Sequence, residues 1–352
     1  MPTIHVHTKP EYDIHIGRGL LDRCGELTRA VKAPCRALVL CDTNVEPLYA
    51  DRVERSFAAT GYEVTRHVFP AGEQSKNLAV LGELLNRLGE EGFTRTDLLA
   101  ALGGGVCGDM GGFAAAVFQR GIDFVQIPTT LLAAVDSSVG GKTAVDLPCG
   151  KNMAGCFWQP KAVICDPDLF DTLSPEVFAC GMAETIKTGA ILDKALFEQL
   201  ERCDIRSEIE AVVARCCELK RSVVEEDERD LGLRQLLNFG HTIGHGIERT
   251  SHFTLPHGYA VAIGMVLMAR AAERLGASEE GITERLISIL QRYGLPTSTD
   301  LPVKTLCEAS HMDKKRSGKD ITIVVPERLG AAVRRRMTME ELDRWIIKGA
   351  SV

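Results

Sequence analysis

Long hydrophobic runs are missing from this sequence. Its apolar runs have the length of strands, and none approaches the ~20 residues that a membrane-spanning helix needs. The N-terminal residues 1–17 also lack the basic segment and apolar core of a secretory signal peptide. We therefore expect a cytoplasmic protein without a membrane partner.

Paired cysteine motifs are absent as well. The 12 cysteines are scattered, no CxxC pair occurs, and Cys216 is followed directly by Cys217. Disulfide frameworks are typical of small secreted domains, whereas this chain has 352 residues. We expect free thiols in a reducing compartment.

The sequence has no excess of basic residues. Its 41 lysines and arginines are outnumbered by 48 acidic residues, which gives a formal net charge of -7. This balance argues against a nucleic-acid partner, because tracking phosphates requires a basic surface. A local basic pocket remains compatible with it.

The pattern along the chain predicts two domains. The first half alternates helical patterns with apolar runs at 36–42, 63–69, 97–105, 124–130 and 161–168, which indicates βα units and a parallel sheet. From Ser174, a capping residue followed by proline, the pattern is helical, with short β-like runs near 321–326. We predict a Rossmann-like α/β domain over residues 1–173 and a mainly helical, all-α type of domain over residues 174–352.

The segment NFGHTIGHGIE, residues 238–248, combines two histidines with three glycines. On one continuous helix, Asn238, His241, His245 and Glu248 would share a face. Each interior glycine costs a helix roughly 0.5–1 kcal/mol relative to alanine, so we expect a ligand or another backbone to approach closely. One core histidine and one surface histidine is the alternative that this spacing leaves open.

Further candidate metal ligands lie in other segments. GMAETIKTG contains Glu184 and Lys187, for which a surface ion pair is the alternative, and LPHGYA contains His257. One glutamate and histidines from separate segments fit a catalytic zinc with three protein ligands. The HExxH pattern of metalloproteases is not matched, because Thr242 occupies the position of its glutamate.

Two glycine-containing segments suit phosphate groups. LGGGVCGD, residues 102–109, has a GxGxxG pattern between an apolar run and a helical pattern, although it does not open the first βα unit. DSSVGGKTAVDLPCGKN, residues 136–152, combines backbone amides with Lys142, Lys151 and Asn152, which suits a phosphorylated polyol. A glycine-rich surface loop is the alternative there, and a plain turn is the alternative for Asp42 as a ribose acceptor.

Several long motifs together resemble the 3-dehydroquinate synthase family over nearly the whole chain. They are LGGGVCGDMGGFAA, QRGIDFVQIPTTLLAAVDSSVGGKTAVD, GKNMAGCFWQP, GMAETIK, GLRQLLNFGHTIGHGIE and HGYAVAIGM. The resemblance implies an NAD-binding N-terminal domain, a metal- and substrate-binding C-terminal domain, and a homodimer. It also implies conversion of the sugar phosphate 3-deoxy-D-arabino-heptulosonate 7-phosphate to 3-dehydroquinate and phosphate, a lyase reaction in the shikimate pathway. Transient oxidation by NAD, loss of phosphate, reduction and aldol closure make up that reaction.

The resemblance also implies roles for individual residues. Glu184, His241 and His257 match the ligands of zinc or cobalt. The catalytic residues would be His245, Lys142, Lys187, Asp136 and Arg120, of which Arg120 would reach a neighbouring subunit's phosphate site. The substrate-binding set would be Lys142, Asn152, Lys187, Lys220, Arg234, Asn238, His245, Lys315 and Arg120. The NAD contacts would be Asp42, Asn44, Glu73, Lys76, Gly104, Gly105, Val106, Gly108, Asp109, Thr129, Thr130, Lys142, Lys151 and Thr172.

One position departs from the family pattern. The usual HGE after the last zinc ligand reads His257-Gly258-Tyr259 here, which removes a carboxylate close to the metal site. Alternatives to the synthase are a sister sugar phosphate cyclase, a catalytically retired NAD-binding sensor and a zinc-dependent alcohol dehydrogenase relative.

Overall fold

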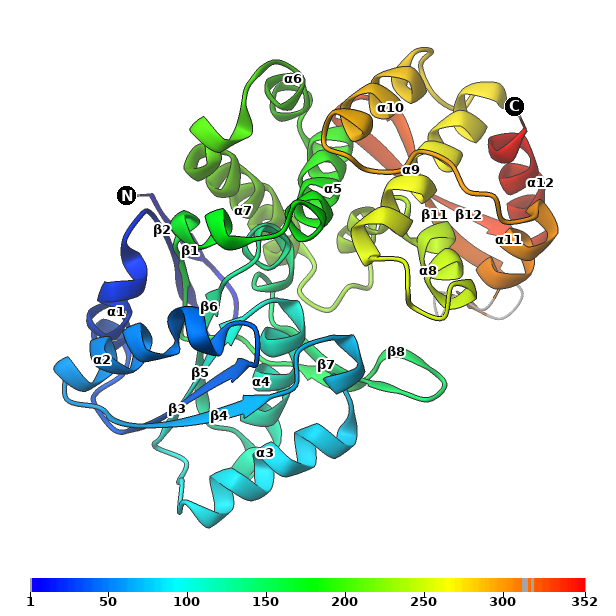
Figure 1. Ribbon diagram of the computed structural model, residues 1–352. Coiled ribbons are helices and arrows are strands. Elements are labelled where there is room, and N and C mark those ends of the chain that lie inside the picture. Colours follow the sequence, from blue (N-terminus) through cyan, green and yellow to red (C-terminus); the bar gives the residue numbers. More distant parts are fainter. Residues whose placement is uncertain (1, 312–315, 318–319, 352) are drawn as a thin grey trace. The chain divides into compact units, whose positions relative to one another are not determined.

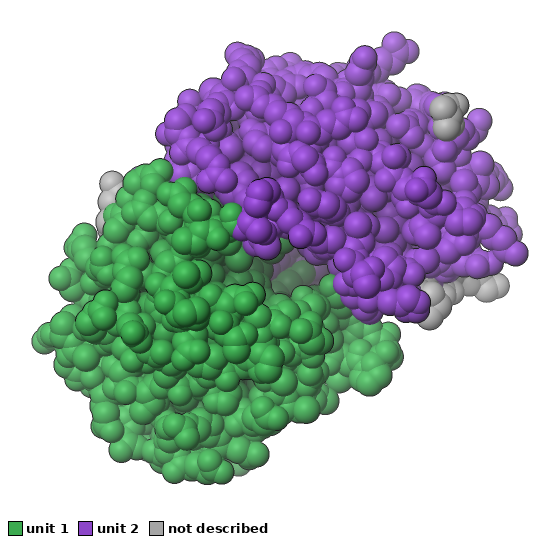
Figure 2. Space-filling model, in the orientation of Figure 1, with its two compact units in different colours: residues 1–173, 220–229 green, residues 174–219, 230–352 purple. Residues whose placement is uncertain are grey.

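The computed structural model describes residues 2–311, 316–317 and 320–351 (Figure 1). The chain forms two compact units, Met1–Leu173 with Lys220–Arg229 and Ser174–Leu219 with Asp230–Val352, which Figure 2 colours separately. The first division falls where the sequence pattern changes from alternating strands and helices to helices. Residues 220–229 belong to unit 1, whereas the sequence pattern assigns them to the second domain.

Unit 1 is built on a seven-stranded sheet with the order β1-β2-β9-β6-β5-β3-β4. The strands are β1 (Thr3–Val6), β2 (Tyr12–Ile16), β9 (Ala162–Cys165), β6 (Asp123–Pro128), β5 (Leu98–Gly103), β3 (Arg36–Asp42) and β4 (Glu63–Phe69). The β1–β2 pair is antiparallel and the other neighbours are parallel. All the strands from β3 to β6, and β9, overlap the apolar runs of the sequence, which confirms the α/β prediction.

Both faces of this sheet are buried. Along β3, Ala37 and Val39 belong to one hydrophobic core, while Leu38 and Leu40 belong to the core on the opposite face. The covering helices are α1 (Cys24–Val31) and α2 (Asp51–Ala59) on the first face, and α3 (Leu78–Glu90) and α4 (Gly105–Val117) on the second. Burial on both faces explains why the parallel strands read as continuous apolar runs.

Outside the large sheet, unit 1 has an antiparallel hairpin of β7 (Lys142–Leu147) and β8 (Gly150–Phe157). The glycine- and lysine-containing segment 136–152 is therefore partly strand. The backbone N–H of Asp146 donates to the carbonyl of Lys76 at 2.8 Å, which fixes the hairpin beside the loop that precedes α3.

Unit 2 is helical, as predicted. Its helices are α5 (Pro175–Leu192), α6 (Lys194–Arg202), α7 (Ile209–Glu226), α8 (His241–Thr250), α9 (His257–Arg274), α10 (Ile282–Arg292), α11 (Val303–Ser310) and α12 (Met339–Ala350), and the last residues of α7 belong to unit 1. The Ser174 hydroxyl accepts a hydrogen bond from the Val177 N–H at 3.3 Å, so α5 begins at the predicted cap.

A small antiparallel sheet completes unit 2, in the order β10 (Arg316–Ser317), β11 (Asp320–Arg328) and β12 (Ala331–Thr338). It includes the β-like run near residues 321–326. Among the helices that the structure describes, none combines the length and the apolar character needed to cross a membrane.

Candidate active site

Glu184, in the middle of α5, carries a carboxylate that is buried in the candidate site, with the residue only 1% exposed. Lys187, one turn later and 2% exposed, forms an ion pair with it. Apart from this ion pair, neither carboxylate oxygen of Glu184 has a hydrogen-bond partner among the described residues. A buried carboxylate in this state has acceptor capacity left for a cation.

Two histidines converge on this carboxylate. The Nε2 atoms of His241 and His257 lie 3.6 and 3.4 Å from the same oxygen, Oε1 of Glu184. His241 is the first residue of α8 and His257 the first residue of α9, so both rings project from helix starts. The structure thus brings together the three metal ligands that the sequence resemblance implies.

The glycines of the NFGHTIGHGIE segment allow α8 and α9 to approach closely. Gly240 precedes α8 with a φ of 78°, and a Cβ there would lie 2.8 Å from the backbone nitrogen of Met265. At Gly244, a Cβ would lie 3.1 Å from the carbonyl oxygen of Ala260. A second backbone therefore fills the space of a side chain at both positions, and at Gly244, which lies inside α8, this contact offsets the helical cost of glycine.

The other nitrogen of each histidine is engaged. Nδ1 of His241 lies 3.1 Å from the carbonyl oxygen of Phe239, and Nδ1 of His257 lies 3.2 Å from Oε2 of Glu248. Both partners are acceptors, so each Nδ1 donates its hydrogen. The Nε2 atoms, which both face Oε1 of Glu184, are then the nitrogens left for a metal ion, as is usual for histidine ligands. These residues fit a zinc or cobalt ion.

The electrostatics of the cluster also favour a cation. Burial lowers the pKa of His257, but the carboxylates of Glu248 and Glu184 outweigh it and raise this pKa to about 10. Positive charge is therefore strongly favoured at this position, as a proton or as a metal ion.

His245 takes a different place from His241. It is half-buried on α8, with its ring centroid 5.3 Å from that of His241 and 6.1 Å from that of His257. Potential ligand atoms of His245, Glu248 and His257 lie within 4.8 Å of one another, and those of Glu184, His241 and His257 form a separate set by the same distance. His245 is thus beside the candidate metal ligands without belonging to the same set.

The prediction that Asn238 shares a helix face with the histidines is wrong. Asn238 ends the 3-10 helix η8 (Leu233–Asn238), and the left-handed Gly240 separates it from α8. Its side-chain amide donates to the carbonyl of Gln235 at 3.1 Å. Arg234 lies on the same short helix and is 2% exposed.

In unit 1, the GxGxxG segment forms the turn from β5 to α4. Gly104 is the N-cap of α4, and Gly105, Val106 and Gly108 lie in its first turns. The first backbone N–H groups of a helix have no acceptor within the helix and are open at its N-terminal end. This turn can therefore hold a pyrophosphate. A Cβ at Gly104 would lie 3.2 Å from the Thr130 side chain, and the Thr129 N–H donates to the Gly103 carbonyl at 3.0 Å.

A second group of predicted cofactor residues surrounds the buried ammonium of Lys76. The ammonium lies 2.6 Å from Oδ2 of Asp109 on α4 and 2.5 Å from Oδ1 of Asn152 on β8, although Asn152 is predicted to bind the substrate and not the cofactor. Burial lowers the pKa of Lys76, but Asp109 and Glu73 outweigh it and raise this pKa, so the ammonium stays protonated. Lys151 and Glu73 face each other at 3.5 Å.

Other predicted cofactor residues have local roles. Oδ1 of Asp42 accepts from the N–H groups of Asn44 and Val45 at 2.8 and 3.0 Å, so Asp42 is at least a turn residue. The Thr172 hydroxyl lies 2.6 Å from that of Tyr49 and donates to the Leu169 carbonyl at 3.0 Å.

The other residues predicted to bind substrate or to act in catalysis lie on several different elements. Lys220 on α7 forms an ion pair with Asp136, which lies in the π-helical turn η5 (Ala133–Ser137). Lys142 begins β7 with an exposed side chain, and Arg120 is exposed with a φ of 68°. Lys315 lies outside the described residues.

Tyr259 faces another part of α5. Burial raises its pKa, and the negative charge of Glu176 adds to this. A residue that sequence reasoning placed on the histidine face without a role is Glu248, which is buried and bonded to His257. In the sequence, a carboxylate one helical turn after a candidate histidine, on the same face, can indicate a residue that holds a metal-binding histidine in place.

The chain matches two family models. One, described as 3-dehydroquinate synthase N-terminal, matches residues 66–180, and one described as 3-dehydroquinate synthase C-terminal matches residues 181–316. The 3-dehydroquinate synthase of Clostridium acetobutylicum is 42% identical over 341 residues, which cover 95% of this chain and 96% of the relative.

Solved structures of cyclases share the fold. ValA, a 2-epi-5-epi-valiolone synthase from Streptomyces hygroscopicus subsp. jinggangensis 5008 with NAD+ and Zn2+ bound, is 26% identical with a TM-score of 0.85, covering 96% of each chain. A 2-deoxy-scyllo-inosose synthase complexed with carbaglucose-6-phosphate, NAD+ and Co2+ is 24% identical with a TM-score of 0.87, covering 99% of this chain and 100% of that one. Fold and site together define a sugar phosphate cyclase. Within this class, the chain belongs to the 3-dehydroquinate synthase family.

Proposed function

We propose that this protein converts 3-deoxy-D-arabino-heptulosonate 7-phosphate to 3-dehydroquinate and phosphate, with a catalytic NAD and a divalent metal ion. The observation that carries the proposal is the buried group of Glu184, His241 and His257 in a chain that matches the family over nearly its full length. When bound, NAD supplies a hydride acceptor and donor, and the metal ion lowers the pKa of the substrate hydroxyl.

Residues of unit 2 supply the metal ligands and a proton carrier. Glu184, His241 and His257 would hold zinc or cobalt through one carboxylate oxygen and two imidazole nitrogens. His245, half-buried beside these ligands and outside their set, would take and return the hydroxyl proton. The buried ammonium of Lys187 and the guanidinium of Arg234 would bind anionic groups of the substrate.

Residues of unit 1 would bind the dinucleotide. The turn of Gly104 and Gly105 at the start of α4 offers backbone amides to its pyrophosphate. Asp109, Lys76 and Lys151 offer charged groups beside this turn, and Asp42 ends the neighbouring strand β3. The tight Lys76–Asp109–Asn152 contacts hold these side chains in fixed positions, which lowers the entropic cost of binding.

We also propose a homodimer in which Arg120 binds the phosphate in the site of the partner copy. Its exposed side chain, on a residue with a positive φ at the end of the short 3-10 helix η4 (Phe118–Arg120), is compatible with such a role. Mixing unfolded Arg120→Ala and His245→Ala chains and refolding them should restore about one quarter of the activity, because half of the dimers then contain one intact site. No recovery would contradict sharing of Arg120.

Substrate identity is tested by phosphate release from the heptulosonate phosphate and from hexose and heptose phosphates that sister cyclases use. Release from the heptulosonate phosphate alone is expected. His245→Ala protein, purified in the same way, controls for a contaminating host enzyme. Release only from another sugar phosphate would identify a sister cyclase, and release from none would favour a retired NAD-binding sensor.

A further inference from the structure

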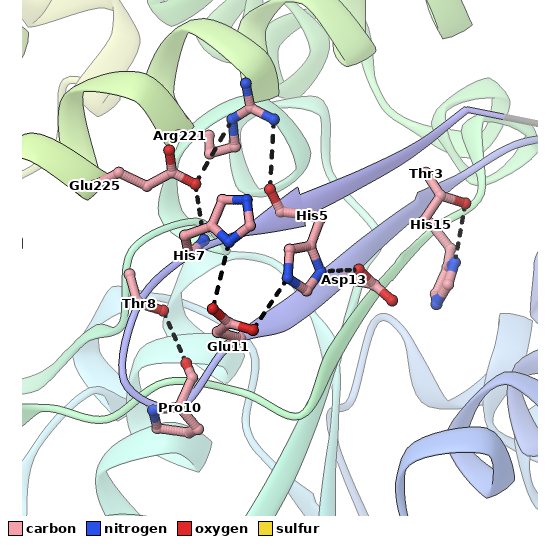
Figure 3. A network of polar contacts seen from close by, with 10 residues as sticks. All are labelled: Thr3, His5, His7, Thr8, Pro10, Glu11, Asp13, His15, Arg221 and Glu225. Carbon is pink, nitrogen blue, oxygen red and sulfur yellow. Dashed lines mark hydrogen bonds and ion pairs between the residues drawn. The ribbon is translucent and has the colours of Figure 1, made fainter.

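A second group of possible metal ligands lies on the N-terminal hairpin of unit 1. His5, His7 and Glu11 are exposed, and one potential ligand atom from each lies within 4.8 Å of the others (Figure 3). His5 is on β1, whose alternating burial places it on the outer face, and the other two flank the connection to β2. This group shares no residue with the candidate active site.

The two imidazoles face opposite oxygens of one carboxylate. Nε2 of His5 lies 3.3 Å from Oε2 of Glu11, and Nδ1 of His7 lies 3.3 Å from Oε1. The rings themselves are close, with centroids 4.5 Å apart. Ligand atoms bound tetrahedrally at the usual zinc–nitrogen distance are about 3.3–3.4 Å apart. The two nitrogen–oxygen separations of 3.3 Å are therefore compatible with an ion bound among these side chains.

A second carboxylate orients the first histidine. Nδ1 of His5 lies 2.7 Å from Oδ1 of Asp13, its direct partner across the β1–β2 pair. Because a carboxylate only accepts, Nδ1 donates its hydrogen and Nε2 is the nitrogen directed to Glu11, as Figure 3 shows. Metal-bound histidines are typically held in this way by a carboxylate.

Contacts with α7 hold the backbone of the group in place. The His7 N–H donates to Oε1 of Glu225 at 2.7 Å, and Arg221 donates to the His5 carbonyl at 3.4 Å. Inside the connection, the Thr8 hydroxyl donates to the Pro10 carbonyl at 2.9 Å. The two histidines are therefore positioned by fixed backbone, so that little order has to be gained on binding an ion.

We propose that His5, His7 and Glu11 form a second metal site, for a borderline divalent cation of the zinc, nickel and copper group. Two imidazoles and one carboxylate suit these ions, whereas calcium and magnesium prefer oxygen ligands throughout. The exposed position leaves room for water as a further ligand. A bound ion would link β1 to the residue before β2 across their connection, at the edge of the sheet where β1 is the terminal strand.

The test counts Zn2+ bound per full-length chain by equilibrium dialysis followed by elemental analysis. We expect the His5→Gln/His7→Gln double variant to bind one ion fewer than the unchanged protein. His15→Gln is the matched control, because His15 lies on the same face of β2 with its Nδ1 3.4 Å from the Thr3 hydroxyl. It should bind as many ions as the unchanged protein.

Equal counts in the double variant and the unchanged protein would overturn the proposal, as would an equal loss in His15→Gln. Glu11→Gln, which keeps both imidazoles, should lower the affinity for the same ion by at least tenfold. An unchanged affinity would also contradict the assignment. Circular dichroism checks that the variants are folded. The count does not depend on turnover, so the two proposals can fail separately.

Discussion

Glu248 accepts a hydrogen bond from Nδ1 of His257 at 3.2 Å, and the other nitrogen of that ring faces Glu184. Glu248 is 1% exposed, so its carboxylate is shielded from water. The arrangement fixes both the orientation of the ring and the nitrogen that is left for a metal. It suggests a positioning role for Glu248, which contacts the candidate ligand His257 through the nitrogen that faces away from Glu184.

Removing that carboxylate should weaken the metal site. We expect Glu248→Ala to lower metal affinity by about 10–100-fold, because His257 loses the acceptor that orients it. Glu248→Gln keeps an acceptor oxygen and should lose less. Titration with Zn2+ against a competing chelator measures this, with Glu279→Ala, an exposed glutamate of unit 2, as control. A control-like affinity in Glu248→Ala would show that the bond does not support the site.

The two histidines of α8 should behave differently. His241→Ala removes a ligand of the Glu184 group and should lose both the metal and turnover. His245→Ala should keep the metal and lose turnover by about 100-fold or more, the usual contribution of a general acid or base. Metal content and activity of both variants are measured in parallel. If they hold metal equally well, the division of roles between these histidines is incorrect.

The Lys76–Asp109 pair should contribute to both stability and cofactor binding. Lys76→Met leaves the carboxylate of Asp109, which is 18% exposed, without its cation. We expect the free energy of unfolding to fall by about 3 kcal/mol, the lower end of the range for breaking a buried ion pair. NAD should also bind more weakly. Chemical denaturation and NAD titration measure these effects.

Lys151→Met is the control for this pair, since Lys151 meets Glu73 at 3.5 Å in a more exposed position. In the Lys151→Met variant, the free energy of unfolding should change by about 1 kcal/mol or less. Adding Asp109→Asn to Lys76→Met should recover part of the lost stability. Equal effects of the two lysine substitutions on stability would argue against a buried ion pair.

The tight contact between α8 and α9 predicts a cost for any side chain at Gly240. Gly240→Ala adds a Cβ 2.8 Å from the Met265 nitrogen on a residue with a φ of 78°. We expect the free energy of unfolding to fall by about 2–5 kcal/mol, from left-handed strain and overpacking together. Gly276→Ala, with a φ of 65° and nothing within 4 Å, isolates the strain and should cost about 1–2 kcal/mol. If both variants lost the same free energy of unfolding, the steric clash with α9 would make no contribution at Gly240.

Local patterns predicted much of the fold because they act over short distances. The apolar run of β3 reflects burial on both faces, and the Ser174-Pro175 pair caps α5 as its residue types suggest. The β1–β2 and β7–β8 hairpins were not predicted, since their stability depends on partners elsewhere in the chain. In particular, β2 pairs with β9, from the far end of unit 1.

The candidate site shows the same limit. Helical spacing alone put Asn238 in line with His241, because periodicity does not reveal that Gly240 takes a left-handed conformation and begins a new helix there. The residue types of Glu184, His241 and His257 suggested a metal site, but only the fold brings these three helices together. The bond from His257 to Glu248 likewise depends on how α8 packs against α9.

The most direct test of the proposed reaction follows phosphate released from 3-deoxy-D-arabino-heptulosonate 7-phosphate, with NAD present, while absorbance at the NADH band is recorded. We predict many phosphates per chain, loss of release when a chelator removes the metal, recovery on adding Zn2+ or Co2+, and no net NADH. Absence of release from protein that holds both metal and NAD would contradict it. Steady accumulation of NADH would do so as well, and would indicate a dehydrogenase.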